Sequence, residues 1–371
     1  MTDAPSATEA RVLGIRLQDF RNHAGLALAF AGRSTVLVGA NGAGKTNVLE
    51  ALSLLTPGRG FRRGRLADFG RHGGSGAFAI AADIDGRYGE TRIVIAAGPG
   101  DSQRSIRING EVRPADELSD YLRVLWLVPA MDGLFTGSAG DRRRFLDRLV
   151  LTIDPGHGRR VARYDGAVSS RNRLLESHAA DPAWLDAVET EIAAIGTAVA
   201  AARREAVDCL ARLIASRDDS AFPRAGLALD GEVDAALASS SAADVEDWLR
   251  ADLKASRSRD RAAGRTLLGP HRSDLMVRHG AKDMPAALCS TGEQKALLIG
   301  LVLAQAALVR ELAGFVPLLL FDEIAAHLDA ARRRALFDLI EALGAQAFMT
   351  GTEAAPFADL AGRAEFIDLT P

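Results

Sequence analysis

The residues with the clearest chemical potential form one short glycine-rich segment. It matches the pattern G-x-x-x-x-G-K-[ST] at every position and reads Gly39, Ala40, Asn41, Gly42, Ala43, Gly44, Lys45 and Thr46. Glycines in such a loop let backbone N–H groups point at phosphate oxygens, and the helix that follows adds partial positive charge. Lys45 would supply a compact cation for the β- and γ-phosphates, and Thr46 a hydroxyl ligand for Mg²⁺. The segment therefore predicts a site for a nucleoside triphosphate with Mg²⁺, in preference to an ordinary strand-to-helix turn.

Two acids follow an apolar run near the other end of the chain. The run, residues 318–321, is typical of a buried strand, and Asp322 and Glu323 come directly after it. In phosphoryl-transfer enzymes such an acid holds Mg²⁺, and a second acidic or polar group orients the attacking water. We predict these roles for Asp322 and Glu323, with Lys45 as the third catalytic residue. The alternative is a strand that simply ends in solvated acids.

A third candidate segment, residues 290–295, reads Ser-Thr-Gly-Glu-Gln-Lys and opens an apolar helix. By itself it is compatible with an ordinary helix cap, although a serine and a glycine at a helix N-terminus also suit an anion. Its place between the glycine-rich loop and the two acids, followed by residues 327–329 (His-Leu-Asp), resembles the motif order of ABC-type ATPases. In those proteins the serine-glycine segment of one subunit closes on the nucleotide of another. The resemblance implies that Ser290 and Gly292 contact ATP held by a second copy, in a head-to-tail pair.

The elements around these segments predict one α/β body built from both chain ends. Residues 11–20 and 25–30 alternate apolar and polar side chains, and residues 76–108 repeat this pattern between turns, as in an antiparallel sheet. Residues 34–40 form a continuously apolar run that leads into the glycine-rich loop, as expected for a central strand. The C-terminal half of the body would supply the helix after Ser290 and the strand before Asp322.

The middle of the chain reads as helical. Asp181 followed by Pro182 predicts the start of an amphipathic helix of around thirty residues. Ser241 and Asp244 predict a capping box that opens a second helix, and we expect a polar connection over residues 216–241. We therefore predict an α/β body formed from both chain ends with an inserted α-helical arm, and the resemblance in motif order implies that this body is an ABC-type, SMC-like ATPase head. The expected domains are 1–140 (N-terminal half of the head), 141–264 (arm) and 265–371 (C-terminal half).

Composition excludes several other classes of protein. The chain of 371 residues has 41 arginines and four lysines but a net charge of −3. Because its overall charge is slightly negative, nucleic acid could bind only at a local patch of basic residues. Two cysteines cannot by themselves form a disulfide framework or a four-ligand zinc site. The first ten residues lack the order of a secretion signal, and the longest uncharged helical stretch, 14 residues, is shorter than the ~20 that span a bilayer. We expect a soluble cytoplasmic protein that does not enter membranes.

The distance in sequence between the motifs distinguishes among the classes of ABC-type ATPase. Lys45 and Ser290 lie 245 residues apart, farther than in a transporter subunit, whereas an insert of about 120 residues is far shorter than an SMC coiled coil. Within this frame the chain resembles the RecF family of DNA replication and repair proteins from about residue 11 to 370. The blocks that carry the resemblance are FRNH (20–23), GKTNVLEALSLL (44–55), GFR (60–62), RRRFLD (142–147), SRNRLL (170–175) and LGPHRSDL (268–275).

The resemblance implies an activity and partners. ATP, with Mg²⁺, would drive formation of a homodimer on gapped duplexes or single-strand/double-strand junctions, with Arg21 among the nucleotide-contacting residues. Weak, DNA-stimulated hydrolysis would release the protein, and mediators similar to RecO and RecR would help it load the recombinase RecA. Two other readings stay open, namely a nucleotide-gated scaffold acting through protein partners and an ABC-type ATPase whose substrate is not DNA.

Three positions depart from the family pattern. Family members usually have an acid directly after a proline at this place, whereas this chain reads Pro129-Ala130-Met131-Asp132. Asp132 could take the place of that acid, and the sequence does not decide which side chain senses the γ-phosphate. The acidic pair is Asp322-Glu323 where relatives often have two aspartates. The switch histidine of transporters is absent, as in this family, which leaves Thr350 or Thr352 as the expected contact.

Three arginine-rich stretches are candidate DNA-binding segments. Each would neutralise phosphates without reading sequence. The residues singled out are Arg59, Arg62, Arg63 and Arg65 in the first stretch and Arg257, Arg259 and Arg261 in the second; the third runs over residues 142–163. The alternative is that an arginine-biased composition decorates solvated helix faces. The arginines of the RRRFLD block could instead pair with acids.

Overall fold

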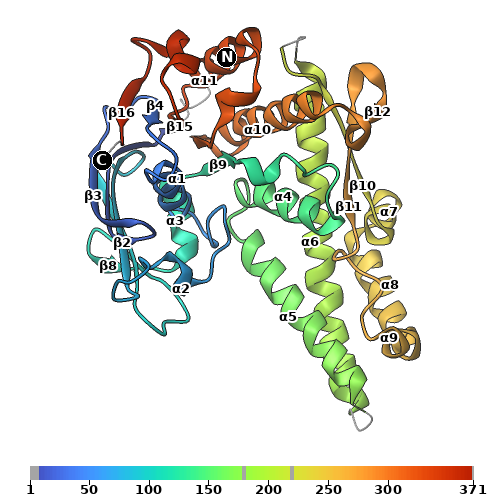
Figure 1. The fold of residues 1–371 in the computed structure, drawn as a ribbon. Helices are drawn as coiled ribbons and strands as arrows, with labels where there is room; N and C mark the ends of the chain where they lie inside the picture. Colours follow the sequence, from blue (N-terminus) through green and yellow to red (C-terminus); the bar gives the residue numbers. More distant parts are fainter. Residues whose placement is uncertain (1–7, 178–180, 218–220, 370–371) are drawn as a thin grey trace. The chain divides into compact units, whose positions relative to one another are not determined.

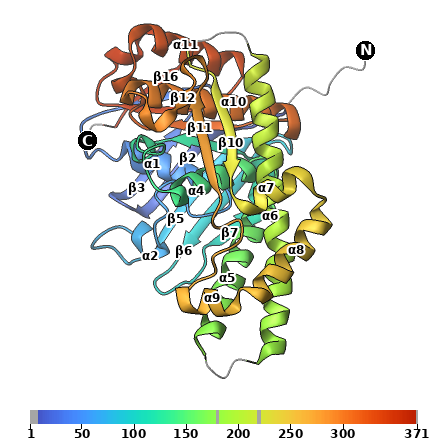
Figure 2. The ribbon, with the colours of Figure 1, turned by 90° about the vertical axis from the view of Figure 1, so that its right-hand side faces the viewer.

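The computed structural model describes residues 8–177, 181–217 and 221–369. Internal contacts divide the chain into two compact units. We call residues 1–132, 218–223 and 290–371 the head unit and residues 133–217 and 224–289 the helical unit, and each is described by itself. Figures 1 and 2 show the elements of both from two directions.

One sheet of the head unit is antiparallel and has the strand order β3-β2-β5-β6-β7-β8. Its strands are β2 (Arg11–Phe20), β3 (His23–Ala29), β5 (Phe78–Asp85), β6 (Thr91–Ala97), β7 (Ser105–Ile108) and β8 (Glu111–Val112). Because side chains alternate between the two faces of a strand, β5 and β6 bury every second residue, whereas β3 at the edge keeps its leucines half-buried. The antiparallel sheet expected over residues 76–108 is present.

The second sheet of the head unit is entirely parallel, with the order β16-β4-β15-β14-β9. Its strands are β4 (Thr35–Val38), β9 (Val124–Leu127), β14 (Leu318–Phe321), β15 (Ala347–Gly351) and β16 (Glu365–Asp368). β4 lies between β15 and β16, so the central strand expected over residues 34–40 is where the sequence placed it. Strands from both ends of the chain therefore share one sheet.

Apolar side chains from both sheets and from α1 (Lys45–Ser53) form one continuous core. At one point of it the rings of Phe20, Phe69 and Phe78 stack or meet edge to face, with centroids 5.6 to 5.9 Å apart. The head unit also contains α2 (Leu66–Phe69), α3 (Leu118–Tyr121), α10 (Thr291–Ala313), α11 (Ala330–Ala342) and the short parallel pair β1 (Thr8–Glu9) and β13 (Phe315–Val316). The core fixes the strand ends that carry the candidate site.

By length and composition alone, α10 could cross a membrane, since one of its windows has a mean hydropathy of 1.8. Two thirds of that window is buried within the protein. Leu297, Leu301 and Leu308 have almost no exposed surface. Burial in a protein core accounts for this composition, because a core helix is as apolar as a membrane span.

The helical unit is organised around α6 (Pro182–Ser216), a helix of 35 residues. Its N-cap is Asp181, whose side chain accepts a hydrogen bond from the amide of Ala183, and Pro182 occupies the first helical position, as the sequence predicts. α5 (His157–Glu176) runs alongside α6 in both views. The other helices are α4 (Ala139–Leu151), α7 (Glu232–Ser239), α8 (Ala242–Ala255) and α9 (Arg257–Ala263). Ser241 caps α8 by accepting from the amide of Asp244, also as predicted.

The polar connection expected over residues 216–241 is wrong in part. Its second half contains α7 and the strand β10 (Ala225–Asp230), which pairs antiparallel with β11 (Asp274–His279). β12 (Met284–Pro285) completes a three-stranded sheet, and Figure 2 shows β10 and β11 side by side. Because β11 and β12 pair with β10, the helical unit extends to residue 289, whereas the sequence placed the end of the arm at 264.

Candidate nucleotide site

The candidate site lies at the carboxyl edge of the parallel sheet. The glycine-rich loop follows β4, the two acids follow β14, and Thr350 lies near the end of β15 between them. In open parallel sheets ligands bind outside this edge, where consecutive loops converge. The strand order β4-β15-β14 therefore brings together residues from both ends of the chain.

The loop has the backbone that a phosphate cradle requires. Gly42 and Gly44 have φ values of +87° and +95°, which only glycine adopts freely, and Gly44 is the N-cap of α1. The Lys45 side chain is buried, and its Nζ donates to the carbonyl oxygens of Gly39 and Ala40 at 2.7 and 2.9 Å. These bonds hold the ammonium against the loop that would receive the phosphates.

A direct contact joins the two ends of the chain. The Thr46 hydroxyl lies 2.9 and 3.1 Å from the two carboxylate oxygens of Asp322, 276 residues away in sequence. The Thr350 hydroxyl donates to Oδ1 of Asp322 at 2.7 Å and accepts the backbone N–H of Glu323 at 2.9 Å. The residues predicted to bind metal thus meet, and Thr350 links Asp322 to Glu323, the acid predicted to orient water.

The donor set suits Mg²⁺. A hydroxyl and a carboxylate are hard oxygen ligands, and Mg²⁺ commonly takes one or two protein carboxylates together with substrate phosphates and water. Among the described residues, no group of three or more His, Cys, Asp and Glu side chains forms a cage that would hold a metal by itself. Thr46 and Asp322 therefore fit a Mg²⁺ that is bound jointly with nucleotide.

The turn between β2 and β3 packs directly against the cradle. Asn22 donates to the carbonyl oxygen of Gly42 and accepts from the side chain of Asn47, and the His23 ring lies 3.3 Å from the carbonyl oxygen of Gly44. A Cβ on Gly44 would overlap that ring. His23 therefore supports the loop from one side in this structure, in line with a packing role.

Arg21, expected to contact nucleotide, is held by a buried acid. Its Nε and Nη2 form a two-pronged ion pair with the carboxylate of Glu50, at 2.8 and 2.6 Å, and Arg62 donates to the same carboxylate at 2.9 Å. Glu50 is fully buried on α1, so two guanidinium groups neutralise a charge that would otherwise be costly to bury. Glu50 lies within the block 44–55 but was not singled out from the sequence, although an acid on the buried face of a helix is itself an unusual signal.

The segment opening α10 is accessible. Ser290 and Gly292 are exposed, and nothing lies within 4 Å of the position a Gly292 Cβ would take. Ser290 and Glu293 form a capping box, in which the serine accepts from the Glu293 amide and the glutamate accepts from the serine N–H and hydroxyl. Ser290 therefore caps the helix in the ordinary way, and the exposed N-terminus of α10 remains accessible to a second molecule.

Asp132 contacts the helix opened by Ser290. Its Oδ2 lies 3.0 Å from Nζ of Lys295, which is buried. The Asp132 side chain is 38% exposed. Lys295 therefore connects α10 to the turn after β9.

The first arginine-rich stretch is only partly free to bind a ligand. Arg62 pairs with Glu50, and Arg65 pairs with Asp68 at 3.3 Å. Arg59 and Arg63 are exposed. Arg59 pairs with no carboxylate among the described residues, so it is the arginine of this stretch best suited to phosphate contacts.

The second stretch lies in the helical unit and is largely committed to neighbouring groups. Arg257 binds the carboxylates of Glu189 and Asp186, and its side chain is 19% exposed. Arg261 donates to a backbone carbonyl at 2.7 Å, and Arg259 lies 3.7 Å from Asp252. These contacts favour a structural role for most of this stretch.

The third stretch pairs with acids, which was one of the two expectations for it. Arg142 forms two 2.7 Å hydrogen bonds with Asp274. Asp147 of α4 accepts from His157 and, twice, from Arg203. Burial would raise the pKa of Asp147, but the hydrogen bonds from His157 and Arg203 outweigh it and hold that pKa below its ordinary value. The RRRFLD block therefore ties α4 to β11, α5 and α6.

His271 is enclosed in the same unit. Its Nε2–H donates to the carbonyl oxygen of Thr266 at 3.0 Å, so its Nδ1 accepts from the Tyr164 hydroxyl at 2.7 Å. Burial lowers the pKa of His271. The ring is therefore a neutral packing element at pH 7.

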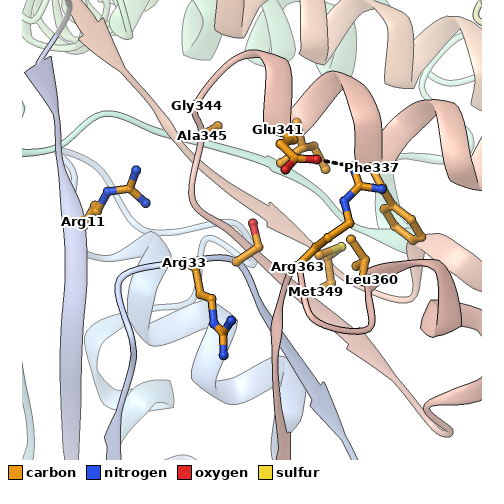
Figure 3. Close-up of a pocket in the computed structure, with 11 residues that line it drawn as sticks. Arg11, Arg33, Phe337, Glu341, Gly344, Ala345, Met349, Leu360 and Arg363 are labelled. Carbon is orange, nitrogen blue, oxygen red and sulfur yellow. Dashed lines mark hydrogen bonds and ion pairs between the residues drawn. The ribbon is translucent and has the colours of Figure 1, made fainter.

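A pocket of about 200 Å³ lies at the opposite edge of the parallel sheet, where the strands begin (Figure 3). Phe337, Met349 and Leu360 line it together with Arg33 and Arg363, among other residues. Arg363 is bound by the carboxylates of Asp338 and Glu341. No motif in the sequence indicated this pocket, because its lining comes from segments far apart in the chain.

Comparison with known proteins agrees with this geometry. Residues 11–362 match the RecF/RecN/SMC N terminal domain family. The DNA replication and repair protein RecF of Mesorhizobium japonicum is 54% identical over 363 residues, which cover 97% of this chain and 96% of the relative.

Solved structures support the fold. Two structures of the recombination mediator protein RecF of the RecFOR pathway, one with ATPrS and one with ATP, match with TM-scores of 0.83 and 0.81 at 21% identity. They cover 95% and 94% of this chain and 95% of their own chains. An SMC head domain from Pyrococcus furiosus matches with a TM-score of 0.51 at 18% identity, covering 94% of this chain and 92% of its own. The predicted ABC-type head with an added helical region is confirmed, and the chain belongs to the RecF family of DNA replication and repair proteins.

Proposed function

We propose that this chain is an ATP-dependent DNA-binding protein in which MgATP drives pairing of two copies and hydrolysis releases them. The observation that carries the proposal is the contact between Thr46 and Asp322. It joins the glycine-rich loop to an acid from the opposite end of the chain, and a hydroxyl beside a carboxylate at this place suits the joint binding of phosphate and Mg²⁺.

The binding steps rest on groups of this chain. The loop amides and Lys45 would receive the phosphates, and the oxygens of Thr46 and Asp322 would hold Mg²⁺. The metal, when bound, would neutralise charge that develops on the transferred phosphoryl group. Glu323, exposed at the same edge, would orient the attacking water and take its proton.

Pairing of two copies follows from the position of Ser290. The glycine-rich loop of one copy would hold one face of the nucleotide, and the exposed serine-glycine end of α10 is available to a neighbour. A closed pair would place that end on the nucleotide of the other copy, adding contacts absent in the single copy. ATP would then shift the equilibrium toward the pair in proportion to those contacts.

DNA would bind by charge at exposed arginines such as Arg59, and binding would weaken strongly with salt. We further propose that this chain recognises gapped duplexes or single-strand/double-strand junctions. It would act with mediators similar to RecO and RecR to load the recombinase RecA, in the cytoplasm. The support is the family and the RecFOR pathway named for the matched structures.

The test uses Glu323→Gln, which keeps size and hydrogen bonding but removes the base. We expect ATP-dependent complexes on a gapped duplex that last longer than those of the parent chain, measured by light scattering after excess unlabelled DNA is added. Glu311→Gln, an exposed glutamate at the end of α10, is the matched control and should behave as the parent. An unchanged lifetime for Glu323→Gln would count against hydrolysis as the release step.

Pairing is tested separately at Ser290. Ser290→Arg should leave ATP binding by the single copy intact and abolish ATP-dependent pairing in sedimentation experiments. Ser290→Ala is its control, because it also removes the helix cap but adds no bulk. Pairing that persists in Ser290→Arg would contradict a role across the subunit boundary.

A further inference from the structure

Thr350 has no exposed surface, although it lies between the two acids of the site. Its hydroxyl has a single proton, which is donated to Asp322 at 2.7 Å, and it accepts the Glu323 amide at 2.9 Å. The hydroxyl therefore both donates and accepts, and water cannot readily replace it because Thr350 itself is fully buried.

The backbone of Glu323 makes the second bond important. Glu323 has φ +53°, a left-handed conformation that costs a residue with a Cβ free energy unless its surroundings hold it there. Its amide donates to the side chain of Thr350, so the direction in which the glutamate leaves the end of β14 depends on that hydroxyl.

The position of Thr350 is itself fixed. It is β-branched and lies within β15, where χ1 is restricted. The next residue, Gly351, packs so closely on the ring of Phe357 that no Cβ fits. Thr352, by contrast, is exposed. Of the two threonines in place of a switch histidine, one is thus enclosed by protein and the other faces solvent.

We propose that Thr350 is a positioning residue that sets both acids of the site, orienting the Asp322 carboxylate for Mg²⁺ and the Glu323 backbone for water activation. This inference rests on the proposed ATPase function. It assigns Thr350 to the acids and leaves Thr352 as the threonine available to the terminal phosphate.

The experiment compares Thr350→Val, which keeps the shape and removes the hydroxyl, with Thr350→Ser, which keeps the hydroxyl. ATP affinity is measured by calorimetry with and without Mg²⁺, so the readout does not require turnover. Mg²⁺ should raise the ATP affinity of the parent chain by some factor. Because Thr350→Val loses one hydrogen bond to a carboxylate, that factor should be roughly 10- to 100-fold smaller in this variant. Its affinity without Mg²⁺ should equal that of the parent, and Thr350→Ser should retain most of the gain.

Thr35→Val is the matched control, because Thr35 is equally buried in the adjacent strand β4 but at the opposite edge of the sheet. It should leave the Mg²⁺ gain unchanged. A full Mg²⁺ gain in Thr350→Val, or an equal loss in Thr35→Val, would overturn the inference. Absence of ATP binding by the parent chain would instead refute the proposed function.

Hydrogen exchange of the parent chain gives a second test that needs no variant. The Glu323 amide should exchange slowly, although its side chain is exposed, because Thr350 accepts its hydrogen. Rapid exchange of that amide would show that the bond is not maintained and would overturn the inference even if Thr350→Val failed to fold.

Discussion

Replacing Arg171 with methionine should destabilise the helical unit more than any surface substitution. Arg171 has no exposed surface, and it donates to Glu189 at 2.9 Å, to Asp260 at 2.7 Å, to the Thr266 hydroxyl at 2.9 Å and to the carbonyl oxygen of Leu253 at 2.6 Å. One guanidinium thereby joins α5 to α6, to α9 and to the end of α8. Glu189 and Asp260 are themselves buried, so their charges depend on this partner.

The size of the expected loss in stability follows from the buried acid that Arg171→Met would leave without an ion-pair partner. Glu189 would keep Arg257, but Asp260 would lose the only guanidinium that pairs with it among the described residues, and breaking a buried pair from one side costs about 3–5 kcal/mol. Arg173→Met is the matched control on the same helix, because Arg173 is exposed and, within the described part of the chain, its side chain bonds to Ser170 alone. It should cost no more than about 0.5 kcal/mol.

Urea unfolding followed by circular dichroism measures both variants. Adding Asp260→Asn to Arg171→Met should recover part of the loss, because the uncompensated carboxylate is then removed. The reasoning fails if Arg171→Met unfolds at the same urea concentration as Arg173→Met, since the buried charges would then not require their partner.

Three further predictions concern the loop, the buried histidine and DNA. Gly44→Ala should lose more ATP affinity in a calorimetric titration than Gly42→Ala, because both have positive φ but only the former meets the imidazole packed on the loop; equal losses would contradict this. Because burial lowers the pKa of His271 below 6.5, the unfolded chain binds its proton first. Stability should therefore fall as pH drops below about 6.5, and the pH profile of His271→Gln in urea should be flatter there. Arg59→Glu should weaken binding to a gapped duplex and reduce its salt dependence, whereas Arg257→Glu should mainly lower stability; the reverse result would contradict the assignment.

Contiguous motifs could be interpreted from the sequence, whereas pairs distant in the chain could not. The phosphate loop is local, so its residues, its preceding strand and its helix were all predictable. The role of Thr350 and the Arg21–Glu50 pair depend on which strands and helices become neighbours, and no spacing encodes that. Strand β10 was missed because only Leu227 and Leu229 carry its alternation, among small residues, and its partner strand follows more than forty residues later.

The most direct test of the account is calorimetric titration of ATP with Mg²⁺ into the parent chain, Lys45→Ala and Asp322→Ala. If both ends of the chain form one site, Mg²⁺-dependent binding should be lost in either variant. Asp322→Ala that binds MgATP as tightly as the parent would contradict the joint site.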